Sequence, residues 1–156
     1  MIKDNVIFKK ILVAVDGSNP SLDAANQAIK LAKKHEAELT ALYVVSPDVR
    51  YDYLQDVLTP GLPGPLKEIL IMAMEGGQKH VDEVKQKASK TKIKVQTDVV
   101  LGSTSVAKAI LDYAEQHNVD LIVIGTRGMS GIKRMLLGST ASDVVTYSHC
   151  PVLVVK

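Results

Sequence analysis

The chain has 156 residues, of which 46% are hydrophobic and 23% are charged, and these values are typical of one globular domain. A net charge of +2 is too small for a protein that binds nucleic acid through a broad basic surface. The single cysteine excludes an internal disulfide, a CxxC redox pair and a cysteine-rich zinc site. We therefore expect one domain over residues 1–156, and composition alone leaves its function open.

The apolar runs of the sequence are too short to predict a signal peptide or a membrane-spanning helix. The run Ile11–Val15 is too short for the core of a signal peptide and is followed by Asp16. No stretch approaches the ~20 apolar residues that a membrane-spanning helix needs. We therefore expect a cytoplasmic protein that binds neither a membrane nor nucleic acid.

Five short runs are predicted to be strands. Three are almost continuously apolar, which is typical of strands buried on both faces of a parallel sheet covered by helices. The other two, which are the second and third in the chain, are more mixed and suit positions nearer a sheet edge. In chain order the runs are Ile11–Val15, Glu38–Val45, Lys94–Val100, Leu121–Gly125 and Val152–Lys156, of which the first, fourth and fifth are the apolar ones.

Four helical patterns separate these strands, each with apolar or small residues recurring on one face. The faces are Leu22, Ala25, Ile29 and Ala32; Ile69, Ala73, Gly77, Val81, Val84 and Ala88; Val106, Ile110 and Ala114; and Ala141, Val144, Val145 and Ser148. Asn19 is expected to cap the first helix, one of Ser103, Thr104 or Ser105 the third, and the fourth is expected to start near Ser139.

The alternation of strands and helices predicts the fold class. It favours an α/β fold with a single doubly wound, open parallel sheet, right-handed crossovers and helices on both faces. One connection, from Ser46 to about Leu66, is long and rich in proline and glycine. A loop of that length in a compact domain is usually functional or disordered.

The segment from Gly125 to Thr140, GTRGMSGIKRMLLGST, carries the strongest functional pattern. It follows the fourth strand, and ligands of open α/β sheets bind at the carboxyl ends of strands. Gly125 and Gly128 allow the backbone to approach a ligand closely. Gly138 and Ser139 lie where the fourth helix should begin, and a helix N-terminus is a ready phosphate site. The hydroxyls of Ser139 and Thr140 can add hydrogen bonds.

The charge of this segment also favours a polyphosphate ligand. Between Gly125 and Gly138 it has three basic residues, Arg127, Lys133 and Arg134, and no acidic residue. The alternative is a glycine-rich turn followed by an ordinary serine helix cap.

Asp16, at the end of the first strand, has two interpretations. It could contact a sugar hydroxyl or a phosphate-bound metal ion, or it could be a turn or helix-capping aspartate. Three competing motifs are absent from the sequence: the P-loop, the G-x-G-x-x-G dinucleotide pattern and the G-x-S-x-G nucleophile elbow.

Three landmarks in this chain resemble the universal stress protein family, in its ATP-binding branch. KILVAVDGS (residues 10–18) is similar to the first strand of the family and LTALYVVSP (residues 39–47) to the second. IGTRGMSGIKRMLLGSTASDVVTYSHCPVLVVK (residues 124–156) is similar to its G-2x-G-9x-G-[S/T] nucleotide loop and the helix and strand that follow. The resemblance spans nearly the whole chain.

The resemblance implies a five-stranded parallel sheet in the order 3-2-1-4-5, with a cleft between strands one and four. It implies Asp16 and the backbone of Ala14 and Val44 near an adenosine, with Ile124 packed beside the same pocket. Around the ribose and phosphates it implies Gly125, Arg127, Gly128, Gly138, Ser139 and Thr140. It also implies Mg²⁺ or Mn²⁺ bridging the phosphates, Asp16 being a candidate ligand, and a homodimer paired through Val152–Val155. Ala141 stands where some ATP-binding relatives have a hydroxyl.

These observations lead to three functional hypotheses. The first is an ATP-binding regulatory protein of the stress response, at most a weak ATPase, since the glycine-rich loop offers no convincing general base. The second is a protein-interaction module whose nucleotide pocket is vestigial. The third is an ATP-using enzyme of the adenine-nucleotide α-hydrolase-like fold, which would need a second substrate pocket.

Overall fold

The computed structural model describes residues 7–46, 64–127 and 137–156, with residues 64–67 described by their backbone alone. Strands and helices alternate along the chain, as the sequence predicts. In order they are β1 (Lys10–Ala14), α1 (Asn19–His35), β2 (Glu38–Val45), α3 (Gly64–Ala88), β3 (Val95–Leu101), α4 (Val106–Gln116), β4 (Leu121–Gly125), α5 (Ser139–Tyr147) and β5 (Val152–Val155).

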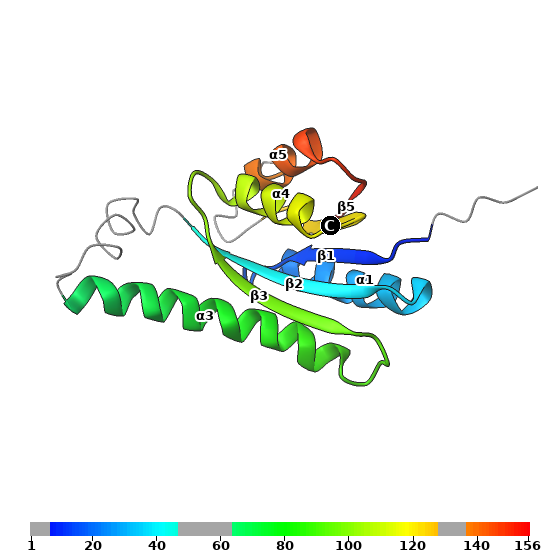
Figure 1. Ribbon diagram of the computed structural model, residues 1–156, viewed down its shortest axis with the longest axis horizontal. Coiled ribbons are helices and arrows are strands. Elements are labelled where there is room, and N and C mark those ends of the chain that lie inside the picture. Colours follow the sequence, from blue (N-terminus) through cyan, green and yellow to red (C-terminus); the bar gives the residue numbers. More distant parts are fainter. Residues whose placement is uncertain (1–6, 47–63, 128–136) are drawn as a thin grey trace, which may run out of the picture.

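The strands form one parallel five-stranded sheet in the order β3-β2-β1-β4-β5, which confirms the predicted fold. In the central register Val13 lies beside Ala41 of β2 and beside Val123 of β4. Helices α1 and α3 cover one face of the sheet, and α4 and α5 cover the other (Figure 1). The chain winds outward from β1 to β3 and then returns to β4, so the topological switch point lies between β1 and β4.

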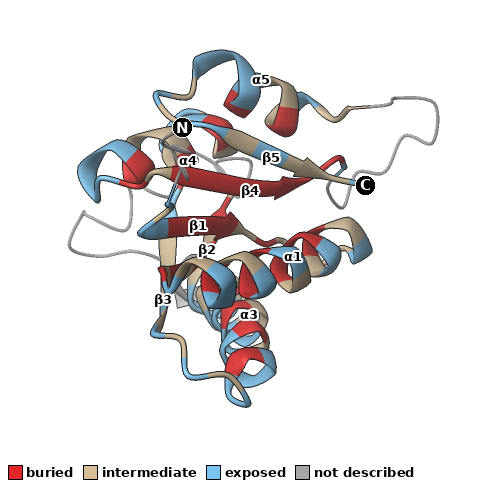
Figure 2. Cartoon of the chain, turned by 90° about the vertical axis from the view of Figure 1, so that its right-hand side faces the viewer, coloured by how far each residue is buried: buried red, intermediate tan, exposed pale blue. Residues whose placement is uncertain are grey.

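Each face of the sheet has its own hydrophobic core, because side chains alternate between the faces of a strand. Ile11 and Val13 of β1 pack toward α1 and α3, together with Leu39 of β2. Leu12 of β1 packs toward α4 and α5, together with Ile122 of β4. Figure 2 shows β4 buried along its whole length, as the apolar sequence of this strand predicts.

The strand order contradicts one expectation about burial and confirms another. β5 is an edge strand, and Leu153 within it is 37% exposed, so the prediction that this run is buried on both faces is wrong. The two mixed runs lie where their sequences suggest, with β3 at the other edge of the sheet and β2 next to it. Glu38, at the first position of β2, forms an ion pair with Lys94.

The caps of two helices are now defined. Ser18, and not Asn19, caps α1, because the Ser18 hydroxyl accepts a hydrogen bond from the Ser21 N–H at 3.3 Å. Of the three residues proposed for α4, Ser105 is the cap, and its hydroxyl accepts from the Lys108 N–H at 3.0 Å.

Helix α3 is longer than the sheet beneath it. Its 25 residues span roughly 37 Å, whereas the 7 residues of β3 span roughly 23 Å. The predicted apolar face is therefore buried only from Gly77 to Ala88, and Ile69 is 45% exposed. The first half of the helix projects past the strands (Figure 1). α3 begins at Gly64, within the connection expected from Ser46 to Leu66, and residues 47–63 of that connection lie outside the described part.

Two residues predicted on the apolar face of the fourth helix are not part of it. Val145 is 46% exposed, and Ser148 follows the last residue of α5. α5 lies at the β5 edge of the sheet, so only one narrow side of the helix packs, and Ala141 and Val144 fill that side.

Candidate functional site

A pocket of about 420 Å³ opens at the carboxyl ends of β1, β2 and β4, beside the first turns of α4 and α5. This is the switch point of the sheet, where ligands of open α/β folds bind. Its lining residues are Ala14, Val15, Asp16, Leu42, Tyr43, Val44, Ser46, Val106, Ile110, Ile124, Gly125, Thr126, Arg127, Gly138, Ser139, Thr140 and Ala141.

The structure brings nine of the predicted site residues together in this pocket. They come from four separate parts of the chain: Ala14 and Asp16, Val44, residues 124, 125 and 127, and residues 138–140. The tenth, Gly128, lies outside the described residues, as do Lys133 and Arg134. Sequence patterns and the family resemblance together thus predicted residues that share one pocket.

Asp16 lies in the tight loop between β1 and α1. One carboxylate oxygen, Oδ1, accepts a hydrogen bond from the Ser18 N–H at 2.9 Å, and the Asp16 N–H donates to the Ser21 hydroxyl at 3.3 Å. Gly17 completes the loop with φ of +83°, a left-handed conformation that favours glycine. Asp16 is therefore a turn aspartate and a pocket-lining residue at once, so its two interpretations do not exclude each other.

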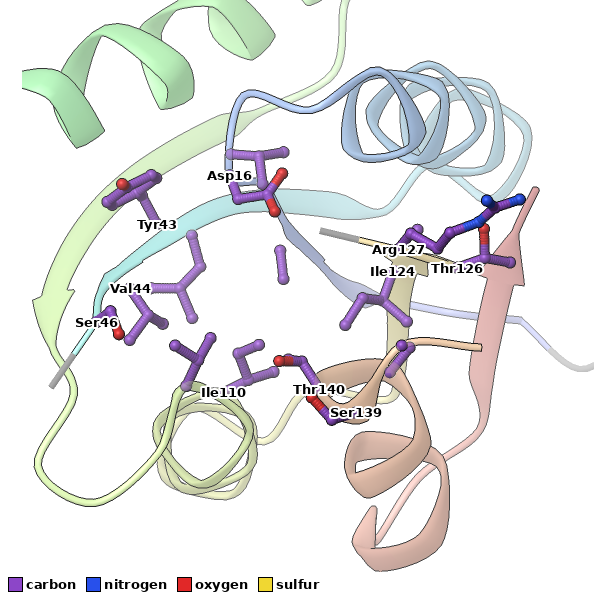
Figure 3. A pocket seen from close by; sticks show the side chains of 17 residues that line it. Asp16, Tyr43, Val44, Ser46, Ile110, Ile124, Thr126, Arg127, Ser139 and Thr140 are labelled. Atoms are coloured by element: carbon purple, nitrogen blue, oxygen red, sulfur yellow. The ribbon is translucent and has the colours of Figure 1, made fainter. Parts of the chain in front are cut away.

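The N-terminus of α5 forms another side of the pocket. Its N-cap residue is Gly138, which has no side chain to accept hydrogen bonds from the first turn. The first turn can therefore offer its N–H groups and the positive end of the helix dipole to an anion. The hydroxyls of Ser139 and Thr140 lie beside these groups, opposite Asp16 across the pocket (Figure 3). Ala141, without a hydroxyl, is buried beneath them.

Two backbone hydrogen bonds hold α5 against the end of β4. The Gly138 N–H donates to the Thr126 carbonyl at 2.7 Å, and the Thr126 N–H donates to the Val155 carbonyl at 2.9 Å. Thr126 is buried. The two ends of the glycine-rich segment are therefore fixed to each other and to β5, which sets the position of the α5 N-terminus.

Gly125 has a packing role that the sequence did not reveal. A Cβ atom at this position would lie 2.7 Å from the carbonyl carbon of Pro20 in the first turn of α1. The glycine therefore allows α1 to pack closely on β4, in addition to lining the pocket.

Arg127 lies at the rim. Its side chain is exposed, and the guanidinium points away from the middle of the pocket (Figure 3). Contact with a ligand in the pocket would require another rotamer, which an exposed arginine can adopt.

The pocket also has an apolar wall. It consists of Leu42 and Val44 from β2, Val106 and Ile110 from α4, and Ile124 from β4. The sequence assigned Val106 and Ile110 only to the packing face of their helix. Their place in the first turns of a helix that starts near the carboxyl end of a strand could have indicated that they line the pocket. Tyr43, Ser46 and Thr126 were also missed, because they lie at positions of the landmark segments to which no role was assigned.

The described residues give little basis for a metal site built from protein ligands. No group of three or more His, Cys, Asp and Glu side chains among them is placed to hold a metal ion. Asp16 is the one carboxylate among the residues that line the pocket. In the part of the chain with assigned structure, no helix has the length and apolar character to cross a membrane.

The fold and the pocket define a doubly wound α/β protein with a ligand-sized cleft at its topological switch point. Residues 7–156 match the model of the universal stress protein family. The chain belongs to this family.

Relatives of known sequence and structure agree with this assignment. The chain is 42% identical over 154 residues to a universal stress protein of Methanocaldococcus jannaschii, with 96% of this chain and 83% of that protein aligned. It is 37% identical over 157 residues to one from Bacillus subtilis, with 96% and 100% aligned. The structure of the universal stress protein UspA from Lactobacillus plantarum matches with a TM-score of 0.84 and 33% identity, covering 97% of this chain and 100% of that one.

Three more distant structures hold an adenine nucleotide. A universal stress protein is in complex with cAMP, one from Archaeoglobus fulgidus is in complex with dAMP, and a family protein from Arabidopsis thaliana has AMP bound. Each matches with a TM-score of 0.64 and covers at least 91% of both chains, at identities of 23%, 20% and 15%. At these identities the likeness shows the shared fold.

Proposed function

We propose that this chain is an ATP-binding regulatory protein of the stress response that acts in the cytoplasm. The nucleotide would lie at the carboxyl ends of β1 and β4. The observation that carries the proposal is that one pocket joins a carboxylate, a helix N-terminus with adjacent hydroxyls and an apolar wall. These are the three kinds of surface that a nucleoside polyphosphate needs for its sugar, its phosphates and its base.

Each part of the nucleotide has a matching surface. The adenine would rest on Val44 and Ile110, since aliphatic side chains and backbone groups form that wall. The ribose would lie near Asp16, whose carboxylate can accept a hydroxyl hydrogen bond. The phosphates would lie at the N-terminus of α5, beside Ser139 and Thr140. Nucleotides held by other members of the family make the adenine class the first one to test.

A divalent ion, Mg²⁺ or Mn²⁺, fits this arrangement only if the nucleotide brings it. Mg²⁺ in nucleotide sites is commonly bound by one or two carboxylates together with phosphate oxygens and water. Asp16 is the carboxylate that could take this part. The ion would neutralise phosphate charge, and Asp16 would share its oxygens between the ion and the Ser18 N–H.

Efficient hydrolysis is not part of the proposal. A general base must reach the attacking water, and the described residues that line the pocket include no histidine and no second carboxylate. We therefore propose at most slow ATP hydrolysis, with nucleotide occupancy as the regulatory variable.

We also propose that the protein forms a homodimer through β5. This strand is at the open edge of the sheet, with Leu153 37% exposed. Val145 and Tyr147 of the neighbouring α5 are 46% and 70% exposed. An apolar strand with a free edge favours pairing with another chain.

Identification of the released ligand tests the proposed function. Protein purified without added nucleotide is denatured, and its supernatant is analysed by chromatography and mass spectrometry. We expect adenine nucleotide in the supernatant or, for protein that purifies empty, a rise in melting temperature on adding Mg-ATP, since binding to the folded state alone stabilises it. If no nucleotide is released and Mg-ATP causes no thermal shift, the proposal is contradicted. That result would favour the interaction module with a vestigial pocket.

A further inference from the structure

The aromatic side chain of Tyr43 and the imidazole of His80 form a stacked pair at the side of the pocket. Their ring centroids are 5.7 Å apart and their planes differ by 24°. Tyr43 belongs to β2 and lines the pocket, whereas His80 belongs to α3 and does not. The pair therefore connects the longest helix of the fold with a wall of the pocket.

Each ring of this stack is in close contact with a glycine. A Cβ at position 17 would lie 2.7 Å from Nε2 of His80 and 2.9 Å from Nδ1, so the imidazole covers the backbone of Gly17. A Cβ at position 77 would lie 2.8 Å from Cε1 of Tyr43. All three distances are shorter than non-bonded contacts allow, so these two glycines permit the close approach of the rings.

The order of contacts runs from α3 into the pocket. His80 contacts both the Tyr43 ring and Gly17. Gly17 directly follows Asp16, and the Asp16 carboxylate accepts its hydrogen bond from the Ser18 N–H within the same loop. The imidazole thus packs on the one residue between the two partners of that hydrogen bond.

From this geometry we infer that His80 is a positioning residue for Asp16. Its ring holds the β1–α1 loop in the conformation that presents the Asp16 carboxylate to the pocket, and so sets the affinity for nucleotide. That the ligand is a nucleotide rests on the proposed function. That His80 fixes the loop conformation rests on the geometry alone. It also makes α3 the element through which contacts outside the pocket can change nucleotide occupancy.

Three variants test the role of His80. His80→Ala removes the ring, while His80→Gln keeps a planar group that can contact Tyr43 and Gly17. His35→Ala is the matched control, because His35 also lies on a helix and contacts an aromatic ring, Phe8, at a centroid distance of 5.2 Å outside the pocket lining. For each variant we measure hydrogen exchange of the peptide over residues 16–22 without nucleotide, and the Kd for Mg-ATP.

We expect His80→Ala to speed exchange of this peptide and to weaken Mg-ATP binding by about tenfold or more, because preorganisation of the binding loop is lost. His80→Gln should retain most of the slow exchange and most of the affinity for Mg-ATP. His35→Ala should change neither the exchange nor the affinity. Unchanged exchange in His80→Ala would overturn the inference, as would wild-type affinity in that variant. If exchange responds as expected but wild-type protein does not bind Mg-ATP, the positioning role stands and the proposed function fails.

Discussion

Gly125 shows how one residue can serve the fold and the pocket together. Its sequence context suggests a glycine kept for close approach of a ligand, yet a Cβ there would meet the backbone of Pro20. Replacing Gly125 with valine would therefore disturb the packing of α1 on β4 whether or not a nucleotide binds. Pocket tests should use residues whose replacement leaves such contacts intact.

Tyr113 gives a prediction about pH at the same scale. Burial, with the charge and hydrogen bond of Asp98 as further causes, raises the pKa of Tyr113 to about 12 from its ordinary value of 10.0. The folded state therefore favours the neutral phenol. The stabilisation that results is fully present below pH 10 and is lost as the pH rises through about 12.

Tyr113→Phe should accordingly lose part of the pH dependence. We expect the free energy of unfolding of wild-type protein to fall more steeply between about pH 10 and 12 than that of Tyr113→Phe. Denaturant unfolding at several pH values measures both slopes. Tyr147→Phe, whose tyrosine is 70% exposed, should retain the wild-type slope, and equal slopes for all three proteins would refute the assignment.

At the scale of the element, α3 has two adjacent glycines with opposite roles. Gly76 and Gly77 are both expected to weaken the helix, because glycine has a low helix propensity. Nothing lies within 4 Å of a Cβ built at Gly76, whereas one at Gly77 would meet the ring of Tyr43. Only Gly76 is therefore a simple cost to the helix.

Alanine at these two positions should change stability in opposite directions. Gly76→Ala should raise the free energy of unfolding by about 0.5–1 kcal/mol, through helix propensity. Gly77→Ala should lower it by about 1–3 kcal/mol despite the same gain, because the methyl group overpacks against Tyr43. Urea unfolding of the two variants and the wild-type protein measures these changes in the free energy of unfolding. A stabilised Gly77→Ala would show that the Tyr43–His80 stack yields without cost.

At the scale of the whole molecule, the two edges of the sheet are β3 and β5. Each exposes one leucine to a similar degree, Leu101 at 39% and Leu153 at 37%. If the dimer forms through β5, only Leu153 should contribute to association.

The two leucines therefore form a matched pair for sedimentation velocity. Wild-type protein and Leu101→Lys should sediment as dimers, and Leu153→Lys as a monomer, since a lysine on an edge strand opposes strand pairing. A dimer that survives Leu153→Lys but not Leu101→Lys would place the interface on β3.

Much of this architecture is encoded in local patterns. Continuous apolar runs predicted β1 and β4 and thus the parallel sheet, and chain order at the carboxyl ends of the strands brought Asp16 and residues 138–140 into one pocket. Contacts between distant segments were not predictable. The stack of Tyr43 on His80 and the packing of Gly125 on Pro20 depend on how the helices sit on the sheet, which no local pattern records. The exposure of Ile69 likewise depends on α3 being longer than the strands.

Phosphate binding at the N-terminus of α5 is the central claim, and a titration of Mg-ATP against three proteins tests it most directly. Thr140→Asp places a negative charge in the pocket, yet an acidic residue in the first turn of a helix stabilises that helix by about 0.3–1 kcal/mol. Thr140→Asn is the neutral control of the same shape. We predict that Thr140→Asp retains or raises the melting temperature and binds Mg-ATP at least about tenfold more weakly than Thr140→Asn, through charge repulsion. Equal affinity in the two variants would contradict the account.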